Sequence, residues 1–367
     1  MTLPSFGHVL SMSDGTGIFE HADHAEPRRE HGYCTDDVAR LLIVVSREPD
    51  RSQAVRELGR TAFRFLAASQ DATGRIRNRR TARGRWKGRH GVEDCWGRSV
   101  WAFGTAARLA PEAWMRASAL SYFGHGVGQR SPHRRAMAFA ALGAAEVVQL
   151  APRHPRARAL LSDAVTAMGP LPSDPGWPWP EPRLSYANAA VPEALIAAGH
   201  ALGRPAVVDH GLTVLRWLLD RETADGHLSP TPVGGAGPTD GVGRYDQQPI
   251  EVAALADACA RAQMVTGDDE WRRGVDLAID WFAGANDVGS VMWDAATSGG
   301  YDGLTPSGPN LNQGAESTLA LISTLQHVPR DAPNGADRTW PGAWPYPANR
   351  SSSASSGTVA TLAPTSA

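Results

Sequence analysis

Lysine is almost absent from this chain. Lys87 is the only lysine among the 36 basic residues, and the other 35 are arginines. A mechanism that joins a lysine amine to a carbonyl would have to use Lys87, which lies in an arginine-rich stretch. No glycine-rich loop ends in Lys-Ser or Lys-Thr, which excludes a P-loop nucleoside triphosphatase.

Cysteines, long apolar runs and net charge are also scarce. Cys34, Cys95 and Cys259 form no close pair, so they fit neither a disulfide framework nor a zinc knuckle. No run of about 20 apolar residues exists, so we expect no membrane span. Residues 1–15 lack the basic start and apolar run of a secretory signal, and we expect a cytoplasmic location. The formal net charge of −2 gives no general attraction to nucleic acid.

The chain is 42% hydrophobic, and its apolar residues recur mostly at helical spacing. We find no series of alternating strands that could build a central sheet. The pattern predicts eleven helices: 36–47, 52–69, 94–109, 111–123, 132–150, 155–168, 186–202, 205–221, 246–265, 268–283 and 312–325.

The links between these helices alternate between short and long. Short links join them into five antiparallel pairs, and 312–325 is left without a partner. Five pairs and one helix predict an all-α fold, an (α/α)6 toroid, with the first helix of each pair inside. All the long loops would then lie on one rim. An open solenoid is the alternative, but its repeats are usually shorter and more uniform.

The composition changes near the C-terminus. Residues 328–367 are rich in Pro, Ser and Ala, which is typical of a disordered tail. We therefore expect one catalytic toroid domain over residues 1–327, followed by this tail.

Polar clusters occur where the long loops meet the predicted inner helices. Carboxylates, amides, tyrosines and tryptophans gathered in one cavity suit a neutral sugar, because hydroxyls bond to the polar groups and pyranose faces stack on indoles. Paired carboxylates supply the acid and base of glycoside hydrolysis. The clusters are 31–37, 93–98, 177–188, 245–251 and 301–317.

Each cluster also has a structural interpretation. Asp36, Asp94 and Asp246 stand at predicted helix starts, where aspartate is a common cap. Asp37 and Glu251 lie past the cap position, so capping explains them less well. Glu316 fits either role equally well, and the pair Asp302-Gly303 is common in turns. Trp177 and Trp179 could instead plug the rim of the core.

Two further stretches favour ordinary roles. His21 and His24 have neither the spacing nor the partners of a zinc site, so we predict no metal. Residues 74–90 hold seven arginines and Lys87, and we expect a solvated, mobile loop there. That loop would become useful if the substrate carried an anionic group.

Several motifs resemble a bacterial family of six-hairpin, (α/α)6-type proteins that are often labelled glycosyltransferase or glycosidase-like. The resemblance runs from about Asp14 to Leu325 and implies a carbohydrate-active toroid. One departure is visible: relatives read Thr-Tyr-Asp-Asn at 185–188, whereas Ala187 stands here in place of the acid. The motifs are DGTGIFEHA (14–22), GYCTDDVAR (32–40), EDCWGRSVWA (93–102), DQQPIE (246–251) and YDGLTPSGPNLNQGAESTLA (301–320).

From these observations we expect a glycoside hydrolase that needs no cofactor and acts on an oligosaccharide or glycoconjugate. The expected acid and base or nucleophile come from Asp37, Asp94, Glu181 and Asp246, with Glu251 and Glu316 in reserve. The expected substrate-binding residues are His31, Tyr33, Asp36, Trp96, Arg98, Trp179, Tyr186, Asn188, Gln247, Gln248, Glu251, Asp302, Asn312 and Glu316.

Three alternatives remain open. A sugar epimerase or isomerase would need paired histidines in the cavity, for which His31 and His133 are the candidates. A glycosyltransferase would need a nucleotide-sugar site, but the sequence shows neither a Rossmann-like half nor a metal-binding Asp-x-Asp motif. A protein of the same fold that associates with a glycosyltransferase is also left open. A non-catalytic glycan-binding toroid is the third. The oligomeric state is left open.

Overall fold

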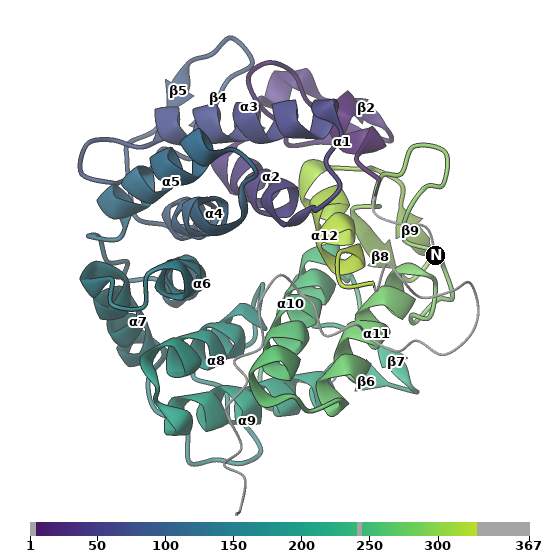
Figure 1. The fold of residues 1–367 in the computed structure, drawn as a ribbon. Coiled ribbons are helices and arrows are strands. Elements are labelled where there is room, and N and C mark those ends of the chain that lie inside the picture. The colour runs from purple at the N-terminus through teal and green to yellow at the C-terminus, as the bar shows by residue number, and fades with distance from the viewer. Residues whose placement is uncertain (1–4, 241–243, 329–367) are drawn as a thin grey trace, which may run out of the picture. The chain divides into compact units, whose positions relative to one another are not determined.

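The computed structural model describes residues 5–240 and 244–328. These residues form a ring of helices in two concentric layers (Figure 1). The predicted tail lies outside the described residues, apart from Val328 at its start. Within the described ranges, no helix combines the length and apolar character needed to cross a bilayer.

The inner layer holds six helices, each in contact with the next around the ring, and the last contacts the first. Their first turns point to the same side of the ring. They are α2 (Thr35–Arg47), α4 (Asp94–Leu109), α6 (Arg134–Leu150), α8 (Ala190–Leu202), α10 (Pro249–Thr266) and α12 (Ala315–Leu325).

The outer layer packs each inner helix against a neighbour in the chain, as the short links predict. Amphipathic sequences explain this layer: in α3, Val55, Leu58 and Leu66 are buried on one face. The outer helices are α3 (Gln53–Ser69), α5 (Ala113–Gly126), α7 (Pro155–Met168), α9 (Pro205–Arg221) and α11 (Glu270–Phe282).

A short helix that the sequence analysis missed completes the ring. α1 (Gly7–Ser11) packs on α12, the helix predicted to have no partner. Val9 and Met12 are fully buried there, and Nε2 of His8 lies 2.7 Å from the carbonyl oxygen of Gln313. The N-terminus thus supplies the missing sixth pair. Its five residues are too few to show a helical period in the sequence.

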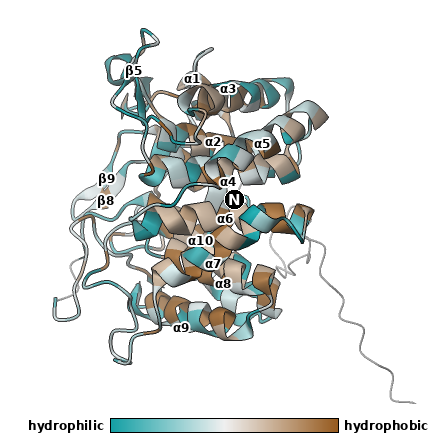
Figure 2. Cartoon of the chain, turned by 90° about the vertical axis from the view of Figure 1, so that its left-hand side faces the viewer, coloured by the Kyte–Doolittle hydropathy of each residue, from teal (hydrophilic) through white to brown (hydrophobic). Residues whose placement is uncertain are grey.

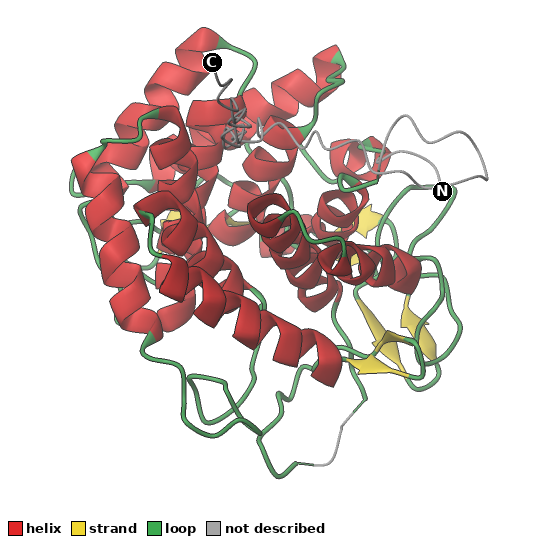
Figure 3. Cartoon of the chain, turned by 60° about the horizontal axis from the view of Figure 1, so that its bottom comes forward, coloured by secondary structure: helices red, strands yellow, loops and turns green. Residues whose placement is uncertain are grey.

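Small antiparallel strands lie in the loops, all on one side of the ring (Figures 2 and 3). Their two or three residues fit the expectation of no central sheet. They are β1 (Ala22–Asp23), β2 (Glu26–Pro27), β3 (Tyr33–Cys34), β4 (Arg79–Arg80), β5 (Trp86–Lys87), β6 (Thr223–Ala224), β7 (His227–Leu228), β8 (Gly303–Thr305) and β9 (Gly308–Asn310), with a 3-10 turn at Arg29–His31.

The arginine-rich stretch forms a hairpin of two short strands where a loop was expected, and its solvent exposure agrees with the prediction. β4 and β5 pair with each other, and β4 also pairs with β3 at the entrance to α2. The Arg80 guanidinium stacks over Trp86 and Phe65, which anchors the hairpin to the outer layer.

Candidate functional site

The loop side of the ring carries a cluster of charged and polar side chains, which we call the mouth. Every inner helix or the segment just before it contributes, because the long loops bring the chain back to the same side each time (Figure 2). The mouth consists of Asp36, Asp37, Arg40, Asp94, Arg98, Arg135, Tyr186, Asn188, Glu251 and Glu316.

Capping does not explain the acids at the helix starts. The N-cap residues of α2, α4 and α10 are Cys34, Glu93 and Gln248, and none of their side chains caps the helix. Asp36 and Asp94 lie inside their helices, and they pair with Arg98 of α4 and with Tyr186 of the segment before α8. The capping interpretation is therefore wrong for both.

An ion-pair chain joins α2 to α12. Oδ1 of Asp37 lies 2.6 Å from the Arg40 guanidinium, which also lies 2.5 Å from Oε2 of Glu316. Burial raises the pKa of Asp37 to about 7, although the positive charge of Arg40 opposes the shift. A buried carboxyl with such a pKa can hold a proton near neutral pH and release it.

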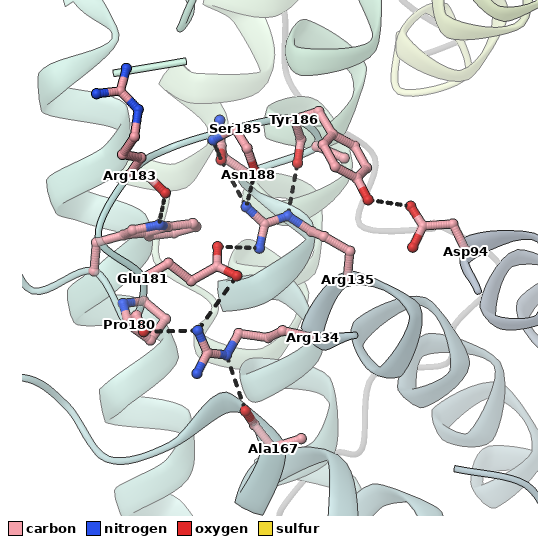
Figure 4. Close-up of polar contacts among 12 residues, drawn as sticks. Asp94, Arg134, Arg135, Ala167, Pro180, Glu181, Arg183, Ser185, Tyr186 and Asn188 are labelled. Carbon is pink, nitrogen blue, oxygen red and sulfur yellow. Dashed lines mark hydrogen bonds and ion pairs between the residues drawn. The ribbon is translucent and has the colours of Figure 1, made fainter. Parts of the chain in front are cut away.

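A second network joins α4, α6 and the segment before α8 (Figure 4). The Tyr186 hydroxyl donates a hydrogen bond to Oδ2 of Asp94 at 2.6 Å. Burial and this acceptor raise the pKa of Tyr186, so the hydroxyl stays a donor. Arg135 donates to the Tyr186 carbonyl oxygen at 2.8 Å and to Oδ1 of Asn188 at 3.0 Å, which fixes the tyrosine over the mouth.

Glu181 is held by two arginines in the same network. Oε2 accepts from Arg135 at 2.8 Å, and Oε1 lies 3.5 Å from Arg134 (Figure 4). A carboxylate with two guanidinium partners is a poor proton donor or base. Glu181 therefore fits a role in orienting Arg135 better than the catalytic role expected from the sequence.

Glu251 shapes the turn before α8. It accepts hydrogen bonds from the backbone N–H groups of Ala187 and Asn188, and burial raises the pKa of its carboxyl to about 7. These bonds explain why α8 starts at Ala190 and not at Tyr186 as predicted. Ala187 has a φ of +43°, a region that suits asparagine or aspartate better than alanine. An aspartate would fit this backbone conformation.

Below the mouth, a hollow lies between the inner helices. Arg40, Arg98 and Ala187 lie at its upper end, because they are close to the first turns. Its walls are largely apolar, and Asp257 and Glu193 lie deeper. The other lining residues are Ile43, Val44, Trp101, Phe139, Ala190, Ile250, Ala253, Ala254, Leu319, Ala320 and Ser323.

Several predicted sugar-binding residues have no free face, including Asn188, which is fully buried between Arg135 and Glu251. Trp96 and Gln247 are fully buried, and Trp179 and Tyr33 nearly so. Each is engaged elsewhere: for example, the Trp96 indole donates to the Gly126 carbonyl oxygen, and the Tyr33 hydroxyl donates to Asp14. They support the walls of the ring and offer no surface to a ligand.

Asp246 and Gln248 lie just before α10. Asp246 is exposed and Gln248 is half-buried, because α10 starts at Pro249 and not at Asp246 as predicted. Asp246 is therefore neither a helix cap nor part of the network of the mouth.

Asp302 and Asn312 hold the turn before α12. Asp302 accepts from the Gly314 backbone N–H at 2.8 Å, and Asn312 accepts from that of His24 at 3.0 Å.

His31 does not form the histidine pair that the epimerase alternative requires. Its ring packs edge-on against His21, with centroids 5.0 Å apart, and His133 is exposed just before α6.

One group of possible metal ligands lies beside the mouth. Glu20, Cys34 and Asp37 each bring one ligand atom to within 4.8 Å of the others. Glu20 is already paired with Arg79, and burial raises the pKa of the Cys34 thiol well above its usual range. Both would have to change state to bind a cation, so the geometry gives no reason to assign a metal. The absence of a metal stays a prediction.

Arg40 and Arg135 belong to the mouth, although neither was predicted from the sequence as a site residue. A signal for Arg40 existed, because it follows Asp37 at the three-residue spacing that brings side chains together on a helix. The sequence held no comparable signal for Arg135, because its partners lie in residues 181–188, about 50 positions later.

No protein-family model matches this sequence, and no curated relative does. Solved structures with the same fold exist. A sugar epimerase from a ruminal bacterium has a TM-score of 0.68 at 11% identity, covering 87% of this chain and 94% of that chain. A cellobiose 2-epimerase from Spirochaeta thermophila has a TM-score of 0.63 at 12% identity, covering 86% and 92%.

A third similar structure is an inactive variant of an alpha-1,6-mannanase from Salegentibacter, with a TM-score of 0.57 at 10% identity and 87% and 94% coverage. At such low identity these likenesses show the fold alone. Together with the closed inner ring, they confirm the predicted (α/α)6 toroid.

Proposed function

We propose that this protein is a carbohydrate-active enzyme that hydrolyses a glycosidic bond in an oligosaccharide or glycoconjugate. One observation carries the proposal: carboxyl groups in unlike surroundings share the mouth above a hollow. Asp37 is buried, with a pKa raised to about 7, whereas Asp94 is partly exposed and receives the Tyr186 hydroxyl. Unlike surroundings are how two carboxyls take separate acid and base roles.

Asp37 is the proposed proton donor. Its Oδ1 is bound to Arg40, and Oδ2 accepts no hydrogen bond within the described part of the chain. Asp94 is the proposed base or nucleophile, oriented by Tyr186. Glu251 has both oxygens engaged by the turn at 187–188 and acts as a positioning residue.

Turnover of aryl glycosides and oligosaccharides, both neutral and acidic, tests the proposal. Asp37→Asn and Asp94→Asn should each lower kcat/KM by roughly 100- to 10,000-fold on any substrate the wild type cleaves. Asp209→Asn, at an exposed position of α9, is the matched control and should retain full activity. Turnover that survives both site substitutions, or no cleavage of any substrate, would contradict the proposal.

The same assay separates the rival functions. The similar structures include epimerases, so the products should be examined for sugars in which the configuration at one carbon is inverted or the carbonyl group has moved. Epimerised sugar without released aglycone would move the assignment to an epimerase. Saturable binding with no chemical change would move it to a glycan-binding toroid.

A further inference from the structure

Arg98 occupies an unusual position at the upper end of the hollow. It is 4% exposed and lines the hollow together with Arg40. Its guanidinium carbon lies 3.9 Å from the centre of the Phe139 ring, so the flat face of the group rests on an aromatic side chain. Packing of this kind holds the guanidinium in place in the ligand-free protein.

The terminal nitrogens of Arg98 have no partner within the described residues. Only Nε approaches a carboxylate, at 3.4 Å from Oδ1 of Asp36. These nitrogens are not among the fully buried polar atoms that lack a partner, so they keep some accessible surface. The open edge of Arg98 therefore points to an acceptor that the protein itself does not supply.

The other acids of the mouth are engaged elsewhere. Glu316 pairs with Arg40, Asp94 accepts from Tyr186, and Glu251 binds the turn before α8. The acids therefore leave the open edge of Arg98 available to a ligand.

Two further donors line the same hollow, whereas Oδ1 of Asp36 beside Arg98 is a buried acceptor without a hydrogen bond. Nε of Arg40 and the indole Nε1 of Trp101 are buried without an acceptor. Burial and repulsion by the charge of Arg40 lower the pKa of Arg98, and the carboxylates of Asp36, Asp94 and Glu316 oppose this shift. A negatively charged ligand atom would relieve this repulsion and satisfy the donors together.

The rim beside α2 is basic as well. The hairpin β4–β5 lies in residues 74–92, which contain seven arginines and Lys87 but no acid. Arg83, Arg85 and Arg89 are exposed on it. The hairpin joins the mouth through β3, which leads directly into α2. A substrate with negative charges along its length would meet favourable potential there before reaching the hollow.

We propose that the sugar unit seated in the hollow carries an anionic oxygen group, a carboxylate or a phosphate, and that the open edge of Arg98 binds it. The substrate is then an acidic saccharide, in place of the neutral sugar expected from the sequence. This assignment rests on the proposed function for the claim that the ligand is a sugar. Arginine suits the role because its planar fork binds carboxylate and phosphate through two parallel hydrogen bonds.

Binding measurements on the full chain test the assignment without relying on turnover. Isothermal titration would compare hexuronates and hexose 6-phosphates with their parent hexoses (glucose, galactose and mannose series). At least one acidic sugar should bind about tenfold or more tightly than its parent, since hydrogen bonds to a charged group are stronger than those to a neutral one. The two acidic series distinguish carboxylate from phosphate. Equal or weaker binding of every acidic sugar would overturn the assignment.

Substitutions at Arg98 then locate the preference. Arg98→Gln should abolish it, and Arg98→Lys, which keeps the charge but loses the planar fork, should retain part of it. Arg204→Gln, at an exposed arginine beside α9, is the matched control and should bind as the wild type does. A preference that survives Arg98→Gln would contradict the role of this residue.

The wild-type comparison stands even if a variant at Arg98 fails to fold, which circular dichroism would show. The two proposals also fail separately. Tight binding of an acidic sugar without cleavage removes the hydrolase and keeps the binding site. Cleavage of neutral glycosides without a preference for acidic sugars removes the anion-binding site and keeps the hydrolase.

Discussion

At the scale of single residues, burial decides which carboxyl can act as an acid. Asp36 and Asp37 are neighbours in the chain, but Asp37 is buried and Asp36 is half-buried, and burial raises the pKa of Asp37 to about 7. The proposed donor must be protonated, so its active form is present below about pH 7 and is lost above it. We expect kcat/KM to fall as the pH rises through about 7. A profile that stays level from pH 6 to 8.5 would argue against Asp37 as the donor.

The hydroxyl of Tyr186 gives a second prediction at this scale. Tyr186→Phe removes the hydrogen bond to Asp94 but little buried surface, because Tyr186 is 44% exposed. We expect kcat to drop about 10- to 100-fold with an almost unchanged Tm, since a hydrogen bond to a charged group contributes about 1.5–3 kcal/mol. Steady-state kinetics and calorimetry measure the two quantities. Tyr122→Phe, on the outer helix α5, is the control, and equal losses in both variants would refute the role.

At the scale of elements, glycines set the distance between the inner helices α4 and α6. A Cβ atom at Gly104 would overlap the carbonyl oxygen of Gly143, and one at Gly143 would overlap that of Val100. The two backbones can approach so closely only without these side chains. This contact places Arg98 and Arg135 on adjacent helices of the mouth.

We therefore expect Gly104→Ala to lower the free energy of unfolding by about 1–3 kcal/mol, because the helices must separate. Gly124→Ala on α5 is the matched control, since its new Cβ would have no neighbour within 4 Å. In that helix the change should stabilise the protein by about 0.4–1 kcal/mol. Thermal or urea unfolding measures both. A stabilising Gly104→Ala would mean that the close approach of α4 and α6 is not required.

At the scale of the whole molecule, buried carboxyls make stability depend on pH. Burial raises the pKa of Asp37 and Glu251 to about 7 and that of Glu222 to about 8. Between the ordinary pKa of these groups, near 4, and their raised values, the folded state binds more protons than the unfolded state. Stability therefore decreases as the pH rises through this window, by about 1.4 kcal/mol per pH unit for each group.

We expect Tm to be higher at pH 5.5 than at pH 8, and Glu222→Gln to reduce this difference. The amide oxygen can keep both hydrogen bonds from Thr231, because both go to Oε1. Glu57→Gln, on the exposed side of α3, should leave the difference unchanged. Calorimetry across the pH range measures it, and a Tm that rises toward pH 8 would contradict the assigned shifts.

The sequence by itself determined the helical ring. Apolar periodicity located eleven of the twelve helices, and the alternation of short and long links determined their pairing and the single loop rim. These signals are local, so they are readable without tertiary contacts. The same loop positions drew attention to Asp37, Asp94 and Tyr186, which the structure brings to the mouth.

Only the tertiary structure decided what each polar or aromatic residue does. The sequence suggested that Asp36 and Asp94 cap helices, but the structure pairs them with Arg98 and Tyr186. Trp179 was predicted to bind sugar, but the fold buries its side chain. The closure of the ring by α1 and the open edge of Arg98 likewise depend on residues far apart in the chain. The burial, ion pairs and pKa of a side chain depend on such contacts, and the periodicity of the sequence does not reveal them.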